Sequence, residues 1–377
     1  MVRDSVTIVG KHGTQRGEGK SIATSRTQLR RYGTQSEIGE GGMGHVYSVR
    51  DRTLNREIAM KVLKKSVASD DFIKRFHVEA QIGGQLEHSG LLPLYDLGQD
   101  SEGNEFFTMR IVPRHQTLED IIGKLQSGDE ECHRRFTMEE RVQIIICIAD
   151  TLSYVHDRGV IHRDIKPANI LIGDGGDVYL VDLGVAVLQS SNLDDAVTTT
   201  IGQEPVDEDE LVGTLLYMSP EQLLGEKNIG VMSDVYSLSV VAYELFCGRH
   251  YLGKEPPSAY LAILSAVLED KRVDAEKHWD EHRRSRVPRQ LSRILRWGLK
   301  KDRQTAIPSS DALSRALRAW QEGRAPVVCP GTLIQRCLGK WAAAIDRRPV
   351  FTPLVSIAGV SVALFCLVYT TLGLLSA

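Results

Sequence analysis

The sequence predicts an α+β fold consisting of a β-rich small lobe, then a helical large lobe, then one C-terminal transmembrane helix. Three observations predict it. Short runs with strand-like patterning cluster in the first third of the chain, helical patterning dominates beyond Thr117, and no charged residue follows Arg348. The length of 377 residues suffices for one large domain or two ordinary ones.

The small lobe is predicted from four strand-like runs and one helix. The runs cover residues 37–49, 57–63, 91–97 and 105–112. The helix covers residues 71–87, where Phe72, Phe76 and Ile82 recur among charged positions. In the large lobe, short strands and loops interrupt the helical pattern near residues 160–185.

Residues 351–375 form an uncharged apolar run, longer than the about 20 residues that a helix needs to cross a bilayer. The alternative is a buried C-terminal helix, but such helices usually carry a polar stripe, and this run shows only Ser and Thr. Basic residues, which stay cytoplasmic, lie just before the run: Arg336, Lys340, Arg347 and Arg348. We therefore expect a single-pass membrane protein with a cytoplasmic N-terminal portion, joined to the helix by an irregular linker at residues 321–350.

Residues 1–31 are polar and rich in Gly, Ser and Thr, which predicts a flexible tail. Residues 17–21 (Gly-Glu-Gly-Lys-Ser) resemble the end of a P-loop, but Thr14 replaces the required first glycine and no apolar strand precedes the run. The net charge of −3 gives no reason to expect a nucleic-acid partner. The six cysteines form no C-x-x-C pair, so they predict neither a zinc site nor a disulfide framework.

A glycine-rich run lies inside the first strand-like segment, at residues 38–46 (Ile-Gly-Glu-Gly-Gly-Met-Gly-His-Val). Glycine lets the backbone approach phosphate oxygens without an intervening side chain. In a dinucleotide-binding fold such a run would open a helix, whereas here residues 46–49 continue as a strand. The pattern favours a flap over a nucleotide, although taken alone it fits a structural turn equally well.

Lys61 lies in the middle of the next apolar strand, where a lysine is costly unless it is paired. Glu79 on the following helix is placed to supply the carboxylate. The alternative is a lysine that reaches water from an edge strand.

The strongest pattern is residues 160–171 (Val-Ile-His-Arg-Asp-Ile-Lys-Pro-Ala-Asn-Ile-Leu), followed by Val-Asp-Leu-Gly at 181–184. Polar residues at fixed spacing among apolar ones are energetically costly unless they form a functional site, so this pattern indicates such a site.

With these motifs the sequence resembles the eukaryotic-like protein kinases, especially their bacterial serine/threonine branch. The likeness rests on Gly-Glu-Gly-Gly-Met-Gly, His-Arg-Asp-Ile-Lys-Pro-Ala-Asn-Ile and Gly-Thr-Leu-Leu-Tyr-Met-Ser-Pro-Glu-Gln. It implies a bilobal protein kinase fold at residues 32–320, with the small lobe at 32–112 and the large lobe at 113–320.

The resemblance implies a role for each polar position. Asp164 would accept or orient the proton of the substrate hydroxyl, and Lys166 would steady the transferring phosphoryl group. Asn169 and Asp182 would hold Mg²⁺, or Mn²⁺ in its place, through hard oxygen ligands. Lys61, held by Glu79, would contact the α- and β-phosphates of ATP.

The resemblance also implies an ATP-binding surface, with Met109 as gatekeeper and Arg110 to Val112 as the hinge. Arg110 departs from the acidic residue usual at this place, which should alter inhibitor preference more than ATP binding. The expected ATP-binding residues are Ile38, Gly39, Gly41, Gly44, Val46, Ala59, Lys61, Met109, Arg110 and Val112.

The activation segment would run from Asp182 to Glu221. Arg163 often pairs in this family with a phosphorylated loop residue, and the candidate acceptors are Thr198, Thr199 and Thr200. A solvated threonine run is the alternative. The acidic residues 207–210 fit a solvated loop, a repellent for acidic substrates or a phosphate mimic, and Thr214 would face the substrate hydroxyl.

One departure from the family concerns Glu221, whose usual arginine partner is replaced by Ala306. A buried carboxylate without a partner is costly, so we expect Arg303 to substitute. Asp234 matches the aspartate that braces the catalytic loop, and Ser239 replaces a glycine nearby.

The sequence therefore predicts a membrane-anchored serine/threonine protein kinase that phosphorylates proteins, itself included. A pseudokinase scaffold at the membrane is the alternative, but Lys61, Asp164 and Asp182 are all present. A kinase for small hydroxyl compounds is disfavoured by residues 213–214 and 219–221, which are sequence features of kinases that act on proteins. Related bacterial kinases dimerise through their small lobes, so a homodimer is left open.

Overall fold

The computed structural model describes residues 31–40, 44–65, 69–100, 102–183, 187–188, 213–226, 229–253, 257, 259–268, 275, 279–280 and 285–324. Several predicted features lie outside the described residues: most of the N-terminal tail, Gly41, the threonines at 198–200, the acidic residues 207–210 and the transmembrane segment at 351–375. None of the helices within the described ranges is both long and apolar enough to cross a bilayer.

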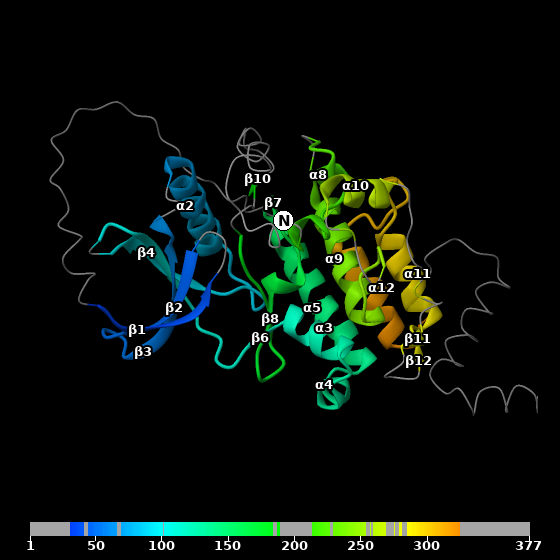
Figure 1. Ribbon diagram of the computed structural model, residues 1–377, viewed down its shortest axis with the longest axis horizontal. Helices are drawn as coiled ribbons and strands as arrows, with labels where there is room; N and C mark the ends of the chain where they lie inside the picture. Colours follow the sequence, from blue (N-terminus) through cyan, green and yellow to red (C-terminus); the bar gives the residue numbers. More distant parts are fainter. Residues whose placement is uncertain are drawn as a thin grey trace, which may run out of the picture.

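The small lobe is built on an antiparallel sheet, which in the described part of the chain has five strands in the order β1-β2-β3-β5-β4. One helix, α2, follows β3 and lies against the sheet (Figure 1). The elements are β1 (Tyr32–Glu40), β2 (Gly44–Asp51), β3 (Arg56–Leu63), α2 (Asp70–Gln85), β4 (Leu94–Gln99) and β5 (Glu105–Met109).

Strand alternation sorts the side chains of this sheet into two clusters. Met60 and Phe106 pack in a cluster on one face, whereas Leu63 and Phe107 join Phe76 of α2 in another. Because successive strand residues point to opposite faces, Lys61 shares the face of Leu63, which is the face that α2 covers. The helix can therefore present a carboxylate to this lysine.

The fifth strand is shorter than the sequence predicts, since β5 ends at Met109 and the expected strand continued to Val112. The backbone N–H of Arg110 donates to Pro93 O (3.0 Å) and does not extend the β5 ladder. Val112 instead packs with Leu92 and Tyr179 in a small cluster that joins the two lobes.

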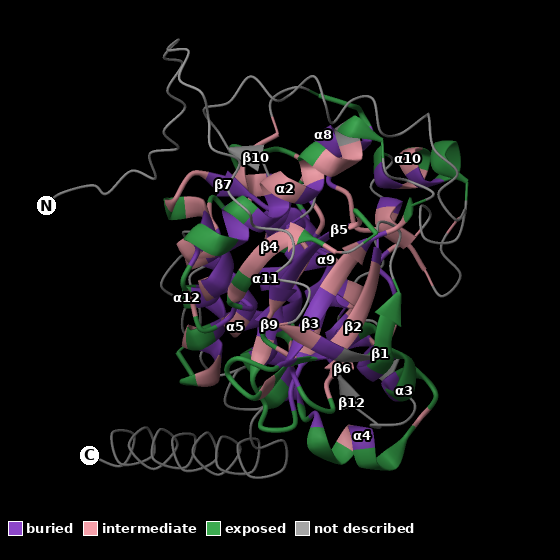
Figure 2. Ribbon diagram, turned by 90° about the vertical axis from the view of Figure 1, so that its left-hand side faces the viewer, coloured by how far each residue is buried: buried purple, intermediate pink, exposed green. Residues whose placement is uncertain are grey.

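The large lobe is mainly helical, and its core is the largest hydrophobic cluster of the described residues. Helix α9 is buried along nearly its whole length and packs on α5, while exposed residues lie on outer elements such as α4 (Figure 2). The helices are α3 (Leu118–Gln126), α4 (Glu130–Arg135), α5 (Met138–Asp157), α8 (Pro220–Leu223), α9 (Val231–Cys247), α10 (Tyr260–Leu268), α11 (Arg289–Gly298) and α12 (Ser310–Gln321). The short strands are β6 (Gln116–Thr117), β7 (Val160–Ile161), β8 (Ile170–Ile172), β9 (Val178–Leu180), β10 (Val187–Leu188), β11 (Trp279–Asp280) and β12 (Ser285–Arg286).

Local sequence sets where the main helices of the large lobe begin and end. Thr117 and Asp120 form a capping box that starts α3, and the Thr137 side chain caps α5. Helix α9 ends at Gly248, whose φ of 68° is a left-handed conformation that glycine adopts without strain.

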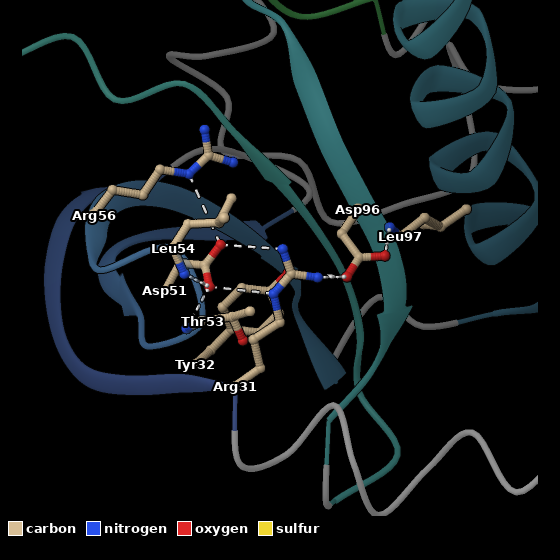
Figure 3. A network of polar contacts seen from close by, with 8 residues as sticks. All are labelled: Arg31, Tyr32, Asp51, Thr53, Leu54, Arg56, Asp96 and Leu97. Atoms are coloured by element: carbon tan, nitrogen blue, oxygen red, sulfur yellow. Dashed lines mark hydrogen bonds and ion pairs between the residues drawn. The ribbon is translucent and has the colours of Figure 1, made fainter.

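A buried carboxylate ties together the outer end of the small-lobe sheet (Figure 3). Asp51 is fully buried and accepts hydrogen bonds from Arg31 at 3.1 and 3.2 Å. Arg31 also reaches Asp96 on β4 at 3.3 Å, and Tyr32 donates to the same carboxylate at 2.9 Å. Arg31, predicted to lie in the flexible tail, is instead fixed to the sheet by two ion pairs.

Candidate active site

The residues of the strongest sequence pattern lie in a loop between β7 and β8, where the two lobes meet (Figure 1). The loop ends in a short 3₁₀ helix, η2 (Pro167–Asn169). Proline at its first position suits this turn because its fixed φ matches the helix and its missing N–H would have no partner there. The loop thereby places Asp164, Lys166 and Asn169 close together.

Asp164 is the centre of this group. Its Oδ2 accepts a hydrogen bond from Asn169 Nδ2 at 2.8 Å and lies 3.2 Å from Lys166 Nζ. The Asn169 amide also donates to the backbone carbonyl of Asp164 at 2.8 Å. Lys166 Nζ donates further, to Thr214 Oγ1 at 2.8 Å, so the loop predicted to face the substrate contacts the same cluster.

Lys61 and Glu79 form the ion pair that the sequence predicts, with 2.8 Å between Nζ and Oε1. Lys61 Nζ also lies 3.4 Å from Asp182 Oδ1. Burial alone would lower the pKa of Lys61, but the carboxylates of Asp182 and Glu79 raise it well above its usual value. Burial raises the pKa of Glu79, and the Lys61 ammonium opposes that rise. The lysine is therefore a fixed positive charge between two carboxylates.

The predicted ATP-binding residues share the same side of the small-lobe sheet. Val46 pairs with Lys61 across β2 and β3, and Ala59 pairs with Met109 across β3 and β5. A β-carbon on Gly44 would lie 2.6 Å from the carbonyl oxygen of Val62, so the backbone there leaves no room for a side chain. These residues place an apolar surface beside Lys61.

The remaining ATP-binding candidates lie around this surface. Gly39 pairs with Val46, and Ile38 beside it is exposed. Arg110 is exposed and Val112 is buried, with its carbonyl oxygen 2.8 Å from His115 Nδ1. Gly41 is not among the described residues.

Two non-glycine residues of the site have left-handed backbones, Arg163 at φ 67° and Asp182 at φ 66°. Such conformations are disfavoured and persist where the surroundings hold them. Asp234 on α9 supplies part of that support, because its carboxylate accepts from the backbone N–H groups of His162 and Arg163, both at 2.8 Å. The bracing role predicted for Asp234 is confirmed in this geometry.

The oxygens of Asn169 and Asp182 suit a magnesium ion. The Asn169 amide nitrogen is committed to Asp164, which leaves the amide oxygen as its potential ligand atom. The Asp182 side chain is 40% exposed, so its carboxylate is accessible. Carboxylate and amide oxygens are the hard ligands that Mg²⁺ binds, and Mn²⁺ accepts them too.

Two polar residues near the site, Gln222 and His156, are not predicted from the sequence. Gln222 on α8 donates from Nε2 to the backbone carbonyl of Arg163 at 2.9 Å. His156 Nε2 lies 2.8 Å from Asp234 Oδ2. A glutamine and a histidine in helices have many structural uses, and their contacts here join residues 59 and 78 positions apart in the chain, which no local pattern reveals.

The predicted partner of Glu221 is confirmed. Arg303 Nη2 lies 3.2 Å from Glu221 Oε1, and Ser233 Oγ donates to the same oxygen at 2.5 Å. Ala306 lines a small cavity next to this carboxylate. The chain thus supplies an arginine from three residues earlier where the family arginine is missing.

Replacing Arg303 with alanine is expected to lower the free energy of unfolding by about 1 kcal/mol, because Glu221 is buried but Arg303 is partly exposed. Adding Ala306→Arg to that variant should restore part of the loss by returning a cation to the carboxylate. The measurement is the melting temperature, with Arg293→Ala, an exposed arginine on α11, as the control. No difference between Arg303→Ala and the control would exclude Arg303 as the stabilising partner.

Comparison with known proteins shows the family to which this chain belongs. The family model for the protein kinase domain matches residues 32–316. The chain therefore belongs to the protein kinase family, of the bacterial serine/threonine type.

Curated relatives carry the same kind of domain. The chain is 28% identical to serine/threonine-protein kinase PknD of Protochlamydia amoebophila, over 81% of this chain and 31% of that protein. It is 31% identical to the probable serine/threonine-protein kinase PknB of Bifidobacterium longum, over 79% of this chain and 40% of that protein. The chain is 34% identical to serine/threonine-protein kinase PknA of Mycobacterium tuberculosis, over 58% of this chain and 47% of that protein. The chain thus spans less than half the length of these relatives.

Proposed function

We propose that the chain is a membrane-anchored serine/threonine protein kinase that transfers the γ-phosphoryl group of ATP to Ser and Thr hydroxyls of proteins, including its own. The observation that carries the proposal is the pair of charged clusters at the junction of the lobes. One holds Lys61 between Glu79 and Asp182, and the other gathers Asp164, Lys166 and Thr214.

The first cluster and the sheet beside it would bind ATP. Lys61 is a cation with 12% of its side chain exposed and is already held in place, so it can contact phosphate oxygens with little reorganisation. The apolar side chains of Val46, Ala59 and Met109 offer a surface to the adenine ring. The glycine-rich hairpin would cover the phosphates with its backbone.

The second cluster would carry out the transfer. The substrate hydroxyl oxygen attacks the γ-phosphorus while the bond to the β–γ bridging oxygen breaks and ADP leaves. Asp164 accepts the hydroxyl proton, and Lys166 neutralises charge on the transferring group. The hydrogen bond from Lys166 to Thr214 supports a serine or threonine substrate at this place, since Thr214 lies in the loop that would face it.

The metal would be held by Asn169 and Asp182. When bound, Mg²⁺ would neutralise negative charge on the phosphate groups. The chain's own part is to keep both ligand residues in place, through the bonds from Asn169 to Asp164 and from Lys61 to Asp182.

The experiment is transfer of label from γ-labelled ATP to the chain itself and to a generic basic protein, with and without a chelator of divalent cations. Metal-dependent label on Ser or Thr supports the proposal. Measurable ATP binding without transfer would support the pseudokinase scaffold instead. Label on small hydroxyl compounds but not on protein would favour the small-molecule kinase.

The membrane part of the proposal rests on the apolar run at 351–375 and the basic residues before it. The kinase domain would then face the cytoplasm. Anchoring confines the copies to two dimensions, which raises their effective concentration and favours phosphorylation of one copy by another, within a transient or stable homodimer. The threonines at 198–200 are the proposed acceptors.

We expect the intact chain to fractionate with membranes and a chain ended at Arg348 to remain in the supernatant. The physical reason is that burying about 20 apolar residues in the bilayer far outweighs any surface attraction of the remaining domain. Recovery of the intact chain in the soluble fraction would end the anchor hypothesis. Mapping the phosphorylated residues of both forms by mass spectrometry would test the acceptors.

A further inference from the structure

Gln222 is buried, with 7% of its surface exposed, and it makes hydrogen bonds with two separate parts of the large lobe. Its Oε1 accepts from the backbone N–H and the Oγ of Ser219, both at 3.1 Å, which closes the capping box of α8. Its Nε2 donates to the backbone carbonyl of Arg163 at 2.9 Å. The capping box explains the first set of contacts and leaves the bond to Arg163 unexplained.

The bond to Arg163 matters because that residue has a left-handed backbone, with φ 67°. A non-glycine residue keeps this conformation only when its surroundings hold it. The N–H of Arg163 donates to Asp234 Oδ1 on α9, and its C=O accepts from Gln222 on α8. Both backbone polar groups of the strained residue are therefore held, each by a different helix.

Arg163 directly precedes Asp164, so the direction of its carbonyl fixes the peptide plane from which Asp164 extends. If the carbonyl lost its donor, this peptide could rotate and carry the Asp164 carboxylate away from Asn169 and Lys166. The bond thus acts on the reacting group from one residue away.

Helix α8 also follows the loop that contains Thr214. That loop reaches the catalytic cluster through the hydrogen bond from Lys166 to Thr214 Oγ1. The segment from Thr214 to Gln222 is therefore attached to the catalytic loop at both of its ends. The position of this segment is therefore linked to the position of Asp164.

We infer that Gln222 is a positioning residue, which holds the peptide between Arg163 and Asp164 and couples the orientation of the Asp164 carboxylate to the placement of the substrate-facing loop. This inference rests on the proposed kinase function.

Three variants of the full chain separate this role from helix capping. Gln222→Glu keeps an acceptor for Ser219 but turns a second oxygen toward the Arg163 carbonyl in place of a donor. Gln222→Met has similar length and makes neither set of bonds. Ser219→Ala removes the hydroxyl of the cap and leaves the bond from Gln222 to Arg163 intact. For each, kcat, the KM for ATP and the melting temperature are measured.

We expect kcat to fall about tenfold or more in both Gln222 variants, with the KM for ATP changed by less than about twofold, because the Lys61 cluster is untouched. Ser219→Ala should lower the melting temperature and keep kcat within about twofold of the wild type. If Gln222→Glu folds poorly, Gln222→Met carries the test, since it introduces no buried charge.

The inference is overturned if both Gln222 variants keep kcat within about twofold of the wild type, or if Ser219→Ala loses as much kcat as they do. The second result would mean that the cap, and not the bond to Arg163, maintains activity. A wild-type chain that binds ATP but transfers no phosphate would overturn the proposed function, and this inference with it.

Discussion

Replacing Asp164 with asparagine is expected to lower kcat for phosphoryl transfer by about 10³-fold and to leave the fold intact. Asparagine has nearly the same shape, but its amide cannot accept the hydroxyl proton. The hydrogen bond from Asn169 Nδ2 to Asp164 Oδ2 would also lose its charge, and so would the contact with Lys166 Nζ. Both losses act at the carboxylate of Asp164, which accepts the hydroxyl proton, so the effect on kcat should be large.

The measurement is a single-turnover assay with γ-labelled ATP, alongside ATP binding by titration. ATP affinity should change little, because Lys61 and the apolar surface beside it do not contact Asp164 through any described hydrogen bond. Asp157→Asn, which changes an exposed carboxylate at the end of α5, is the matched control and should keep full activity. Transfer by Asp164→Asn at a rate near that of the control would remove Asp164 from its proposed role.

The sequence predicts the elements around this site because their patterns are local. Helix α2 was expected at 71–87 and spans Asp70–Gln85, since apolar residues at helical spacing mark the face that packs on the sheet. The pairing of Lys61 with Glu79 is confirmed because a buried lysine needs a carboxylate and the next helix offers one. The same reasoning about buried charge identified Arg303 as the partner of Glu221.

Contacts between distant segments could not be predicted in this way. Arg31 is the last residue of the predicted polar tail, and nothing in the local sequence indicates that it binds Asp51 and Asp96. The bond from Gln222 to Arg163 depends on a left-handed backbone that the sequence does not reveal, because arginine rarely adopts it. Tertiary structure decides such contacts, and side-chain type alone does not.

The second large effect is expected for Asp234→Asn, which should lower the free energy of unfolding by about 3–5 kcal/mol and reduce kcat as well. The Asp234 carboxylate is 1% exposed and is surrounded by donors: the backbone N–H groups of His162 and Arg163, and His156 Nε2 at 2.8 Å. An asparagine would turn an N–H₂ group toward one of these donors and leave it unpaired. Because two of the donors belong to the catalytic loop, that loop would lose its support together with the fold.

The loss of stability caused by Asp234→Asn should depend on pH in a defined direction. Burial alone would raise the pKa of Asp234, but the hydrogen bond and charge of His156, with the N–H of His162, bring it below its ordinary value of 3.8. A carboxyl group whose pKa is lower in the folded protein stabilises the fold fully above its unfolded pKa, and this contribution is lost as pH falls through the folded value. The contribution of the Asp234 carboxylate to the stability difference between wild type and Asp234→Asn should therefore be fully present above about pH 5 and shrink below about pH 4.

Thermal unfolding of both forms from pH 7 to pH 3 measures this difference, and the expected fall in melting temperature at neutral pH is on the order of 10 °C. Asp311→Asn serves as the control, because Asp311 is an exposed carboxylate on α12 paired with Arg315, and such a pair contributes about 0.5 kcal/mol or less. A neutral-pH loss no larger than that of the control would show that the backbone donors around Asp234 find other partners. In that case the catalytic loop would be held from the side of α8, and Asp234 would not be the group that braces it.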